Sequence, residues 1–234
     1  MIDNVLKNYR YVREYDTSAK ISESLIHSLL QRTWKVTPSK NNFMPYRVLV
    51  IGPDEQSLKD DVFNLCLRNE CRADGETNFE EFFQRRYVDR GIVPQFHNIK
   101  SCSYLILFNQ RVETELNPWQ QYSVNDGRVY EQTSKDNAWR CFKNSCIEVG
   151  MFASTFAALC IESGLDVSHT LCFPTEPKYW EEFWGKFNID DPSAILAMTV
   201  GKGSVYRQDV LEELEKTDLK PDFHKVVQFL KNER

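Results

Sequence analysis

The stretch that decides the fold covers residues 144–164 and reads NSCIEVGMFASTFAALCIESG. Between Val149 and Ile161 no residue is charged, and apolar side chains occur on nearly every side of a helical wheel. Gly164 follows at the position where a glycine commonly ends a helix. The pattern predicts a helix over residues 144–163 that is buried on several sides, in a large core or in a subunit interface.

Charge and length argue against a membrane or a nucleic acid as a partner. Glu148 and Glu162 flank the apolar stretch, which is shorter than the roughly 20 residues that a spanning helix needs. The first residues, 1–4, lack the charged and then apolar layout of a signal peptide. The chain has 29 Lys and Arg against 34 Asp and Glu, a net charge of −5, so it lacks the basic excess typical of nucleic-acid binding. We expect a soluble, cytoplasmic protein.

The cysteines favour a reducing compartment. Their number, seven, is odd, so they cannot all pair within one chain. Cys66 and Cys71 are five residues apart, as are Cys141 and Cys146, and this is not the spacing of a zinc or iron–sulfur site. We therefore expect buried free thiols, which behave as small apolar side chains, and no metal.

Helices and strands are mixed along the rest of the chain. Apolar residues at helical spacing from Leu25 to Trp34 predict a helix over residues 22–35, with Ser22 as its cap and Ile21 and Ile26 as a hydrophobic staple. Residues 109–140 have no clear period and form a variable excursion. We expect one α+β domain over residues 1–234. Its other expected elements are strands over residues 46–52, 103–108 and 194–200, a helix over residues 55–67 and a C-terminal helix at about 222–230.

Common catalytic signatures are missing from the sequence. It contains no glycine-rich phosphate loop, no Gly-x-Ser-x-Gly elbow and no His-Glu-x-x-His motif. An enzyme with so few catalytic groups would take its chemistry from a cofactor.

Three segments carry more information than their surroundings. In residues 9–16, YRYVREYD, Arg10 and Arg13 either fork onto a phosphate or stack on the neighbouring tyrosines as ordinary surface residues. Residues 38–46, PSKNNFMPY, form either a polar loop that reads the edge of a planar ligand or a plain helix-to-strand connection. Residues 169–174, HTLCFP, end a strand at a proline.

Taken in order, these segments resemble the nitroreductase family of FMN-dependent oxidoreductases. The family opens with an Arg-Arg-Ser-x-Arg-x-Phe-like run, then has a helix and a Pro-Ser-x-x-Asn-x-Gln-Pro-Trp loop that enters a strand. Here Arg10, Tyr11 and Arg13 match the first run, and Pro38, Ser39, Asn42, Pro45 and Tyr46 match the loop. Residues 162–165, ESGL, and the strand ending at Gly201 resemble later family elements. The resemblance implies a central mixed or antiparallel sheet flanked by helices, in an intertwined homodimer.

The resemblance also implies which residues hold the cofactor. Arg10, Arg13 and Arg207, with Lys202 as a further candidate, match the basic residues that bind the FMN phosphate. Ser39 and Asn42 match positions that meet the flavin and its ribityl chain, with Asn42 commonly from the partner subunit. Leu171 and Cys172 match a segment whose backbone lies against the flavin ring, where an N–H group favours negative charge on the reduced ring.

The activity implied is the transfer of electrons from NAD(P)H through bound FMN to a nitroaromatic or quinone acceptor, by a ping-pong mechanism. Within the excursion, Trp119, Tyr122 and Trp139 are the candidates for stacking on this small-molecule substrate. Two alternatives stay open. One is a flavin enzyme of the same fold with other chemistry, such as reductive dehalogenation or ring oxidation. The other is a non-catalytic flavin-binding dimer, which the departures from the family pattern at Tyr9, Tyr11 and Met44 favour.

Overall fold

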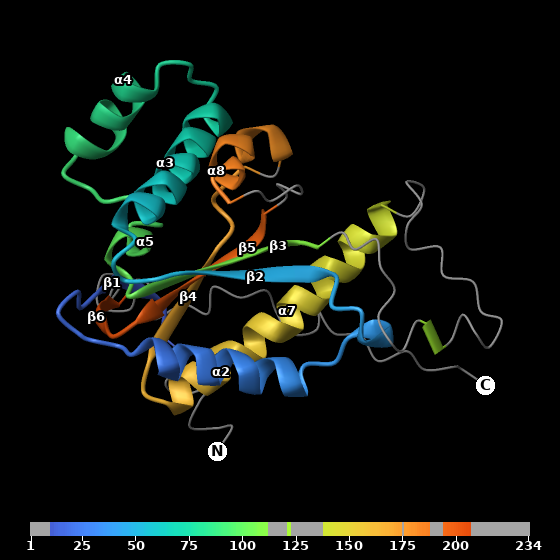
Figure 1. Ribbon diagram of the computed structural model, residues 1–234. Helices are drawn as coiled ribbons and strands as arrows, with labels where there is room; N and C mark the ends of the chain where they lie inside the picture. The colour runs from blue at the N-terminus through green and yellow to red at the C-terminus, as the bar shows by residue number, and fades with distance from the viewer. Residues whose placement is uncertain (1–9, 112–120, 123–137, 175, 188–193, 207–234) are drawn as a thin grey trace, which may run out of the picture.

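Figure 1 shows the computed structural model, which describes residues 10–111, 121–122, 138–174, 176–187 and 194–206. A four-stranded antiparallel sheet in the order β2-β3-β5-β4 lies at the centre, beside a two-stranded ribbon of β1 and β6. The strands are β1 (Val12–Tyr15), β2 (Tyr46–Ile51), β3 (Tyr104–Gln110), β4 (Asp166–Thr170), β5 (Ala194–Gly201) and β6 (Gly203–Tyr206). The helices are α2 (Glu23–Val36), η1 (Lys40–Asn42), α3 (Gln56–Ala73), α4 (Phe79–Phe83), η2 (Gln84–Val88), α5 (Asn98–Ser101), α7 (Ala138–Glu162), η4 (Pro177–Tyr179) and α8 (Glu181–Gly185).

The central sheet separates two hydrophobic cores, because the side chains of a strand alternate between its faces. Along β3, Ile106 and Phe108 pack with α2 and α7, whereas Leu105 and Leu107 pack with α3 and α8. Figure 1 shows the same division, with α2 and α7 below the sheet and α3 and α8 above it. The α+β expectation is confirmed. Every strand pair described is antiparallel, so the alternative of a mixed sheet is not met here.

Helix α7 is the apolar helix that the sequence predicts, and it begins earlier than expected. Val149, Phe152 and Phe156 are buried against the sheet. Among the described residues, 142–162 form a helical stretch that is long and apolar enough to cross a membrane, judged by length and composition alone. The length argument made from the sequence therefore does not hold, because the sufficiently apolar part of the helix covers residues 142–162 and not only 149–161. Its buried face identifies it as the core helix of this fold.

Helix α2 follows the predicted pattern except at one residue. The Ser22 hydroxyl accepts a hydrogen bond from the N–H of Leu25, and Ile21 packs with Ile26 in one cluster, as a capped and stapled helix requires. Trp34, however, is 56% exposed and does not join the core. It lies beyond Leu29 and Thr33, the last residues of α2 that reach the buried face.

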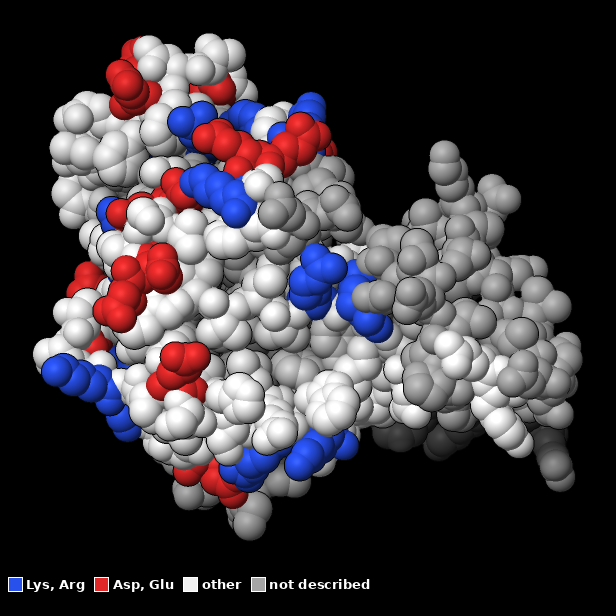
Figure 2. All heavy atoms as spheres, viewed as in Figure 1, with Lys and Arg blue, Asp and Glu red and all other residues white. Residues whose placement is uncertain are grey.

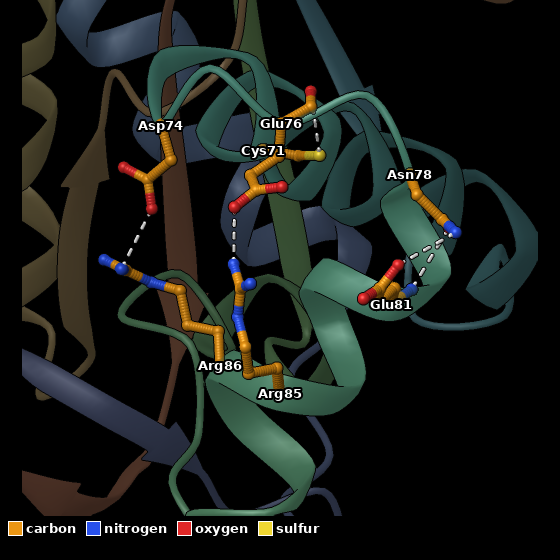
Figure 3. Close-up of polar contacts among 7 residues, drawn as sticks. All are labelled: Cys71, Asp74, Glu76, Asn78, Glu81, Arg85 and Arg86. Atoms are coloured by element: carbon orange, nitrogen blue, oxygen red, sulfur yellow. Dashed lines mark hydrogen bonds and ion pairs between the residues drawn. The ribbon is translucent and has the colours of Figure 1, made fainter.

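Sequence patterns missed the segment after α3. Helix α3 runs on to Ala73, past the expected end at residue 67, and α4 and η2 fold back beside it. Figure 3 shows the polar contacts that fix this return: Arg85 bonds to Glu76, and Arg86 bonds to Asp74. Among the described cysteines all are free, and Cys66, Cys71, Cys102 and Cys160 are buried, as predicted. Cys172 is exposed. The expected helix at 222–230 and most of the 109–140 excursion lie outside the described residues.

The β1–β6 ribbon depends on glycine at position 201. A Cβ atom there would lie 2.5 Å from Cδ1 of the buried Tyr15 ring. We expect Gly201→Ala to lower the free energy of unfolding by about 1–3 kcal/mol, the usual cost of overpacking a core.

Urea denaturation of the full chain measures this loss. Gly52→Ala is the matched control, because a Cβ atom at position 52 meets nothing within 4 Å. An equal loss in both variants would contradict the packing argument.

Candidate cofactor site

Strand β1, which contains Arg13 and follows Arg10, is fixed to the central sheet by buried polar groups. The N–H of Val12 donates to the Ser168 hydroxyl of β4 at 2.9 Å, and the Asn98 amide of α5 donates to the Val12 carbonyl at 3.0 Å. Because buried polar groups must be paired, these bonds set the position of β1 on the sheet.

Tyr15 fixes the other end of β1. Its hydroxyl bonds to the carbonyl of Thr199 and lies 2.9 Å from the Thr199 hydroxyl, and its N–H donates to the Ser101 hydroxyl at 3.1 Å. Burial raises the pKa of Tyr15 well above its ordinary value, and the Thr199 bond only partly offsets this. The phenol therefore stays protonated at neutral pH and donates a hydrogen bond to the Thr199 carbonyl of β5.

Aromatic rings hold both candidate phosphate ligands. The Arg10 guanidinium lies 5.1 Å from the ring centre of Tyr206, and that of Arg13 lies 5.5 Å from the ring centre of Tyr11. Arg13 also donates to the carbonyl of Gln95 at 3.2 Å. Neither forms an ion pair among the described residues. The stacked arrangement foreseen as the alternative to phosphate binding is thus present, but it leaves both charges without a carboxylate.

Leu171 and Cys172 follow directly on β4, the strand that Val12 contacts. Leu171 is 66% exposed, which is unusual for a large apolar side chain next to the core. The Cys172 N–H donates to the Thr170 hydroxyl at 3.3 Å, so this N–H is already used in a hydrogen bond within the chain. The Cys172 carbonyl accepts from the Asn69 amide of α3 at 3.1 Å, which fixes this segment against α3.

Lys202 does not lie with Arg10. The register of the ribbon pairs Val12 with Tyr206 and Tyr15 with Gly203, so Lys202 lies at the Tyr15 end and Arg10 beyond the opposite end. The Lys202 ammonium contacts the Gly164 carbonyl at the end of α7. Arg207 lies outside the described residues.

The 38–46 loop forms a second, separate group. The Ser39 hydroxyl accepts from the N–H of Met44 at 2.7 Å, and the buried Glu148 of α7 accepts from the N–H of Lys40 at 3.0 Å. Arg111, at the end of β3, donates to the carbonyls of Phe43 and Met44. Asn42 is exposed and Pro38 precedes the turn on the surface. These bonds fold the loop around a turn in which Asn42 and Met44 have positive φ.

Helix α2 separates the loop from β1. β1 lies near the N-terminal end of α2, and the loop follows its C-terminal end (Figure 1). A helix of 14 residues is about 20 Å long. One chain therefore does not bring Ser39 and Asn42 to Arg10. The width of the sheet separates them from Leu171, because the loop enters β2 and Leu171 follows β4, and these are the two edge strands. Next to the loop, a hollow of about 570 Å³ opens between α2 and β2, lined among others by Trp34, Asn42 and Met44.

The expected substrate-stacking residues contribute little that can be placed. Tyr122 is described and is 72% exposed. Trp119 lies outside the described residues, and only the backbone of Trp139 is described, within α7.

The residues around β1 fit the chemistry of FMN. Guanidinium groups without a carboxylate suit a phosphate, and an exposed leucine edge suits a flat apolar ring. Sequence reasoning missed the residues that position them, among them Asn69, Ser168 and Thr199. The one signal was polar residues within apolar strands, since such residues must find partners when they are buried.

Comparison with solved structures identifies the architecture. A nitroreductase-like protein from Streptococcus mutans is 17% identical and covers 98% of each chain with a TM-score of 0.62. A protein assigned as an NAD(P)H:FMN oxidoreductase from Staphylococcus epidermidis is 14% identical and covers 98% of this chain and 96% of its own, with a TM-score of 0.64. This chain has the nitroreductase fold. A protein assigned as a nitroreductase from Exiguobacterium sibiricum, solved with FMN, is 16% identical and covers 98% of this chain and 97% of its own, with a TM-score of 0.61.

Sequence comparison alone does not find this relationship. No protein-family model matches the chain, and no curated protein sequence matches it significantly. The likeness therefore lies in the arrangement of elements, as expected for a nitroreductase fold at such low identity.

Arg111 is the positioning residue of the 38–46 loop. In Arg111→Gln the loop loses hydrogen bonds from a charged donor, each worth about 1.5–3 kcal/mol, so we expect amide hydrogen exchange in residues 39–44 to become at least about tenfold faster. Mass spectrometry of exchanged peptides measures this. Arg47→Gln, on the adjoining strand, is the control, and equal exchange in the wild type and Arg111→Gln would contradict the role of Arg111.

Proposed function

We propose that this protein is an FMN-dependent oxidoreductase, which takes electrons from NAD(P)H and passes them to an electron-poor acceptor of the nitroaromatic or quinone type by a ping-pong mechanism. The observation that carries the proposal is the hydrogen bond that joins β1 to the middle of β4. It fixes the segment of Arg10 and Arg13, which pair with no described carboxylate, to the strand that Leu171 follows, within a fold that one neighbour uses to bind FMN.

We assign Arg10 and Arg13 to the FMN phosphate. A phosphate carries a charge of about −2, and hydrogen bonds from guanidinium groups to it are among the strongest in proteins. Tyr206 and Tyr11 orient these guanidiniums without neutralising them. Arg207, the residue after Tyr206, is assigned to the same phosphate, whereas Lys202 is left out because its ammonium contacts Gly164 at the far end of the ribbon.

Leu171 is assigned to the flavin ring. FMN, when bound, supplies the hydride-accepting chemistry that the side chains of this protein lack. Leu171 covers part of the ring and excludes water from it, and the Asn69 bond to Cys172 holds that segment in place. His169, whose pKa is lowered by burial, stays neutral next to this segment at neutral pH.

We further propose that the complete site forms between two copies of the chain. In one chain, Ser39 and Asn42 lie beyond the other end of α2 from β1, and this helix is about 20 Å long. A partner is therefore needed to bring them to the flavin. Exposed apolar residues support an interface of this kind. They include Trp34 and Val36 of α2, Val50 of β2, and Phe142 and Ile147 of α7.

Titration of the protein with FMN, followed by quenching of flavin fluorescence, tests the assignment. Each lost hydrogen bond to a charged group costs about 1.5–3 kcal/mol, so Arg10→Gln/Arg13→Gln should raise the Kd for FMN at least about tenfold. Arg32→Gln is the control, because this exposed arginine of α2 pairs with Glu162 at the end of α7.

Equal FMN affinity in the double variant and the wild type would contradict the phosphate assignment.

Steady-state rates with varied NADPH and quinone should give parallel double-reciprocal lines. Intersecting lines would contradict the ping-pong mechanism.

A further inference from the structure

A second hollow, of about 350 Å³, lies on the opposite side of α3 from the core. It opens between α3 and the η4–α8 segment, and its volume falls within the usual range of small-molecule sites, roughly 300–1,000 Å³. Figure 2 shows basic and acidic side chains gathered over α3 and α8. Three of the lining residues are cations: Arg68, Arg72 and Lys178.

Aromatic rings lie against all three cations, and no carboxylate in the described part of the chain pairs with them. The Arg72 guanidinium stacks 3.5 Å from the ring centre of Tyr179, and the Lys178 ammonium lies 4.8 Å from the same ring. Arg68 lies 5.5 Å from the ring centre of Phe79. A ring under a guanidinium fixes its plane and leaves the N–H groups along its edge free to donate. The three side chains are therefore oriented without being neutralised.

Neighbouring arginines show the ordinary arrangement. Arg85 pairs with Glu76 at 2.5 Å and Arg86 with Asp74 at 3.0 Å (Figure 3). Arg86 also pairs with Glu70 at 3.1 Å. None of the three pocket cations forms such a pair among the described residues. Three cations around one hollow, none of them paired with a described carboxylate, give this end of the hollow a positive charge that favours an anion from elsewhere.

The two acidic residues of the pocket do not supply that anion. Asp61 accepts from the Lys186 ammonium at 2.7 Å, and Glu182 also acts on Lys186. Asp61 is seven residues before Arg68 on α3, about 10 Å along the helix axis. The pocket is thus divided into an acidic end, balanced by Lys186, and a basic end that is not balanced.

The basic end is connected to the segment proposed to contact the flavin. Arg72 donates to the Asn69 side-chain oxygen at 3.2 Å, and the Asn69 amide donates to the Cys172 carbonyl at 3.1 Å. A ligand held by Arg72 is therefore one side chain away from residues 171–172. The partial negative charge at the C-terminal end of α3 favours a cation at Arg72. It does not explain why Lys178 of η4 lies against the same tyrosine ring.

We propose that Arg68, Arg72 and Lys178 form a binding site for a phosphomonoester, separate from the site of the FMN phosphate. Two planar guanidiniums and an ammonium match a dianion with three acceptor oxygens. The phosphomonoester comes either from the electron donor, as the 2′-phosphate of NADPH, or from a free phosphorylated metabolite. Only the first source rests on the proposed function.

Calorimetric titration of the FMN-saturated protein with adenosine 2′,5′-bisphosphate tests the site without turnover. We expect binding in the wild type, at least tenfold weaker binding in Arg68→Gln/Arg72→Gln, and unchanged binding in Arg85→Gln. No binding in the wild type, or equal binding in the double variant, would overturn the proposal. Thermal melting of each variant identifies any loss of binding caused by misfolding. Lys178→Gln, an exposed residue on the η4 side of the hollow, repeats the binding test without a change in α3.

Kinetics with the two nicotinamide donors then identifies the source. If the donor supplies the phosphate, the double variant loses at least tenfold in kcat/KM for NADPH and less than twofold for NADH. If a free metabolite supplies it, binding is lost while both kcat/KM values stay unchanged. A chain that binds the bisphosphate but oxidises neither donor would contradict the proposed function and leave the phosphate site standing.

Discussion

The buried phenol of Tyr15 holds the strand on which the candidate site depends. β1 is only four residues long, and its partner β6 is equally short, so the ribbon has little stability of its own. Tyr15 bonds to Thr199 of β5, and Gly201 leaves room for its ring. Through this contact and the Val12–Ser168 bond, the segment that carries the two arginines is fixed to β4 and β5. Without it, Arg10 and Arg13 would be surface residues with no defined neighbours.

The sequence predicts the elements that carry their own periodic pattern. The apolar stretch of α7, the cap and staple of α2 and the strands at Tyr46, Tyr104 and Ala194 all follow from local spacing. The β1–β6 ribbon does not, because its bonds join residues far apart in the chain, such as Val12 and Ser168, and its few residues have no pattern. Trp34 fits the helical spacing of α2 but lines the open hollow between α2 and β2, and no local signal records that this hollow is left unfilled.

For the site, the resemblance names the candidate residues and the structure gives their neighbours. Arg10 and Arg13 were expected either to bind phosphate or to stack on tyrosines, and the structure combines a stacked geometry with charges that pair with no described carboxylate. The same arrangement recurs at Arg72 and Tyr179. A ring can hold a cation in place while leaving it able to bind an anion, so the two readings are not alternatives in this protein.

The most direct measurement is the visible absorption spectrum of the purified protein, with chemical identification of any chromophore released on denaturation. The account predicts a flavin spectrum, recovered as FMN, that is bleached by NADPH under anaerobic conditions. A colourless protein that stays colourless after incubation with FMN would contradict the central claim, that the β1–β4 junction is a flavin site.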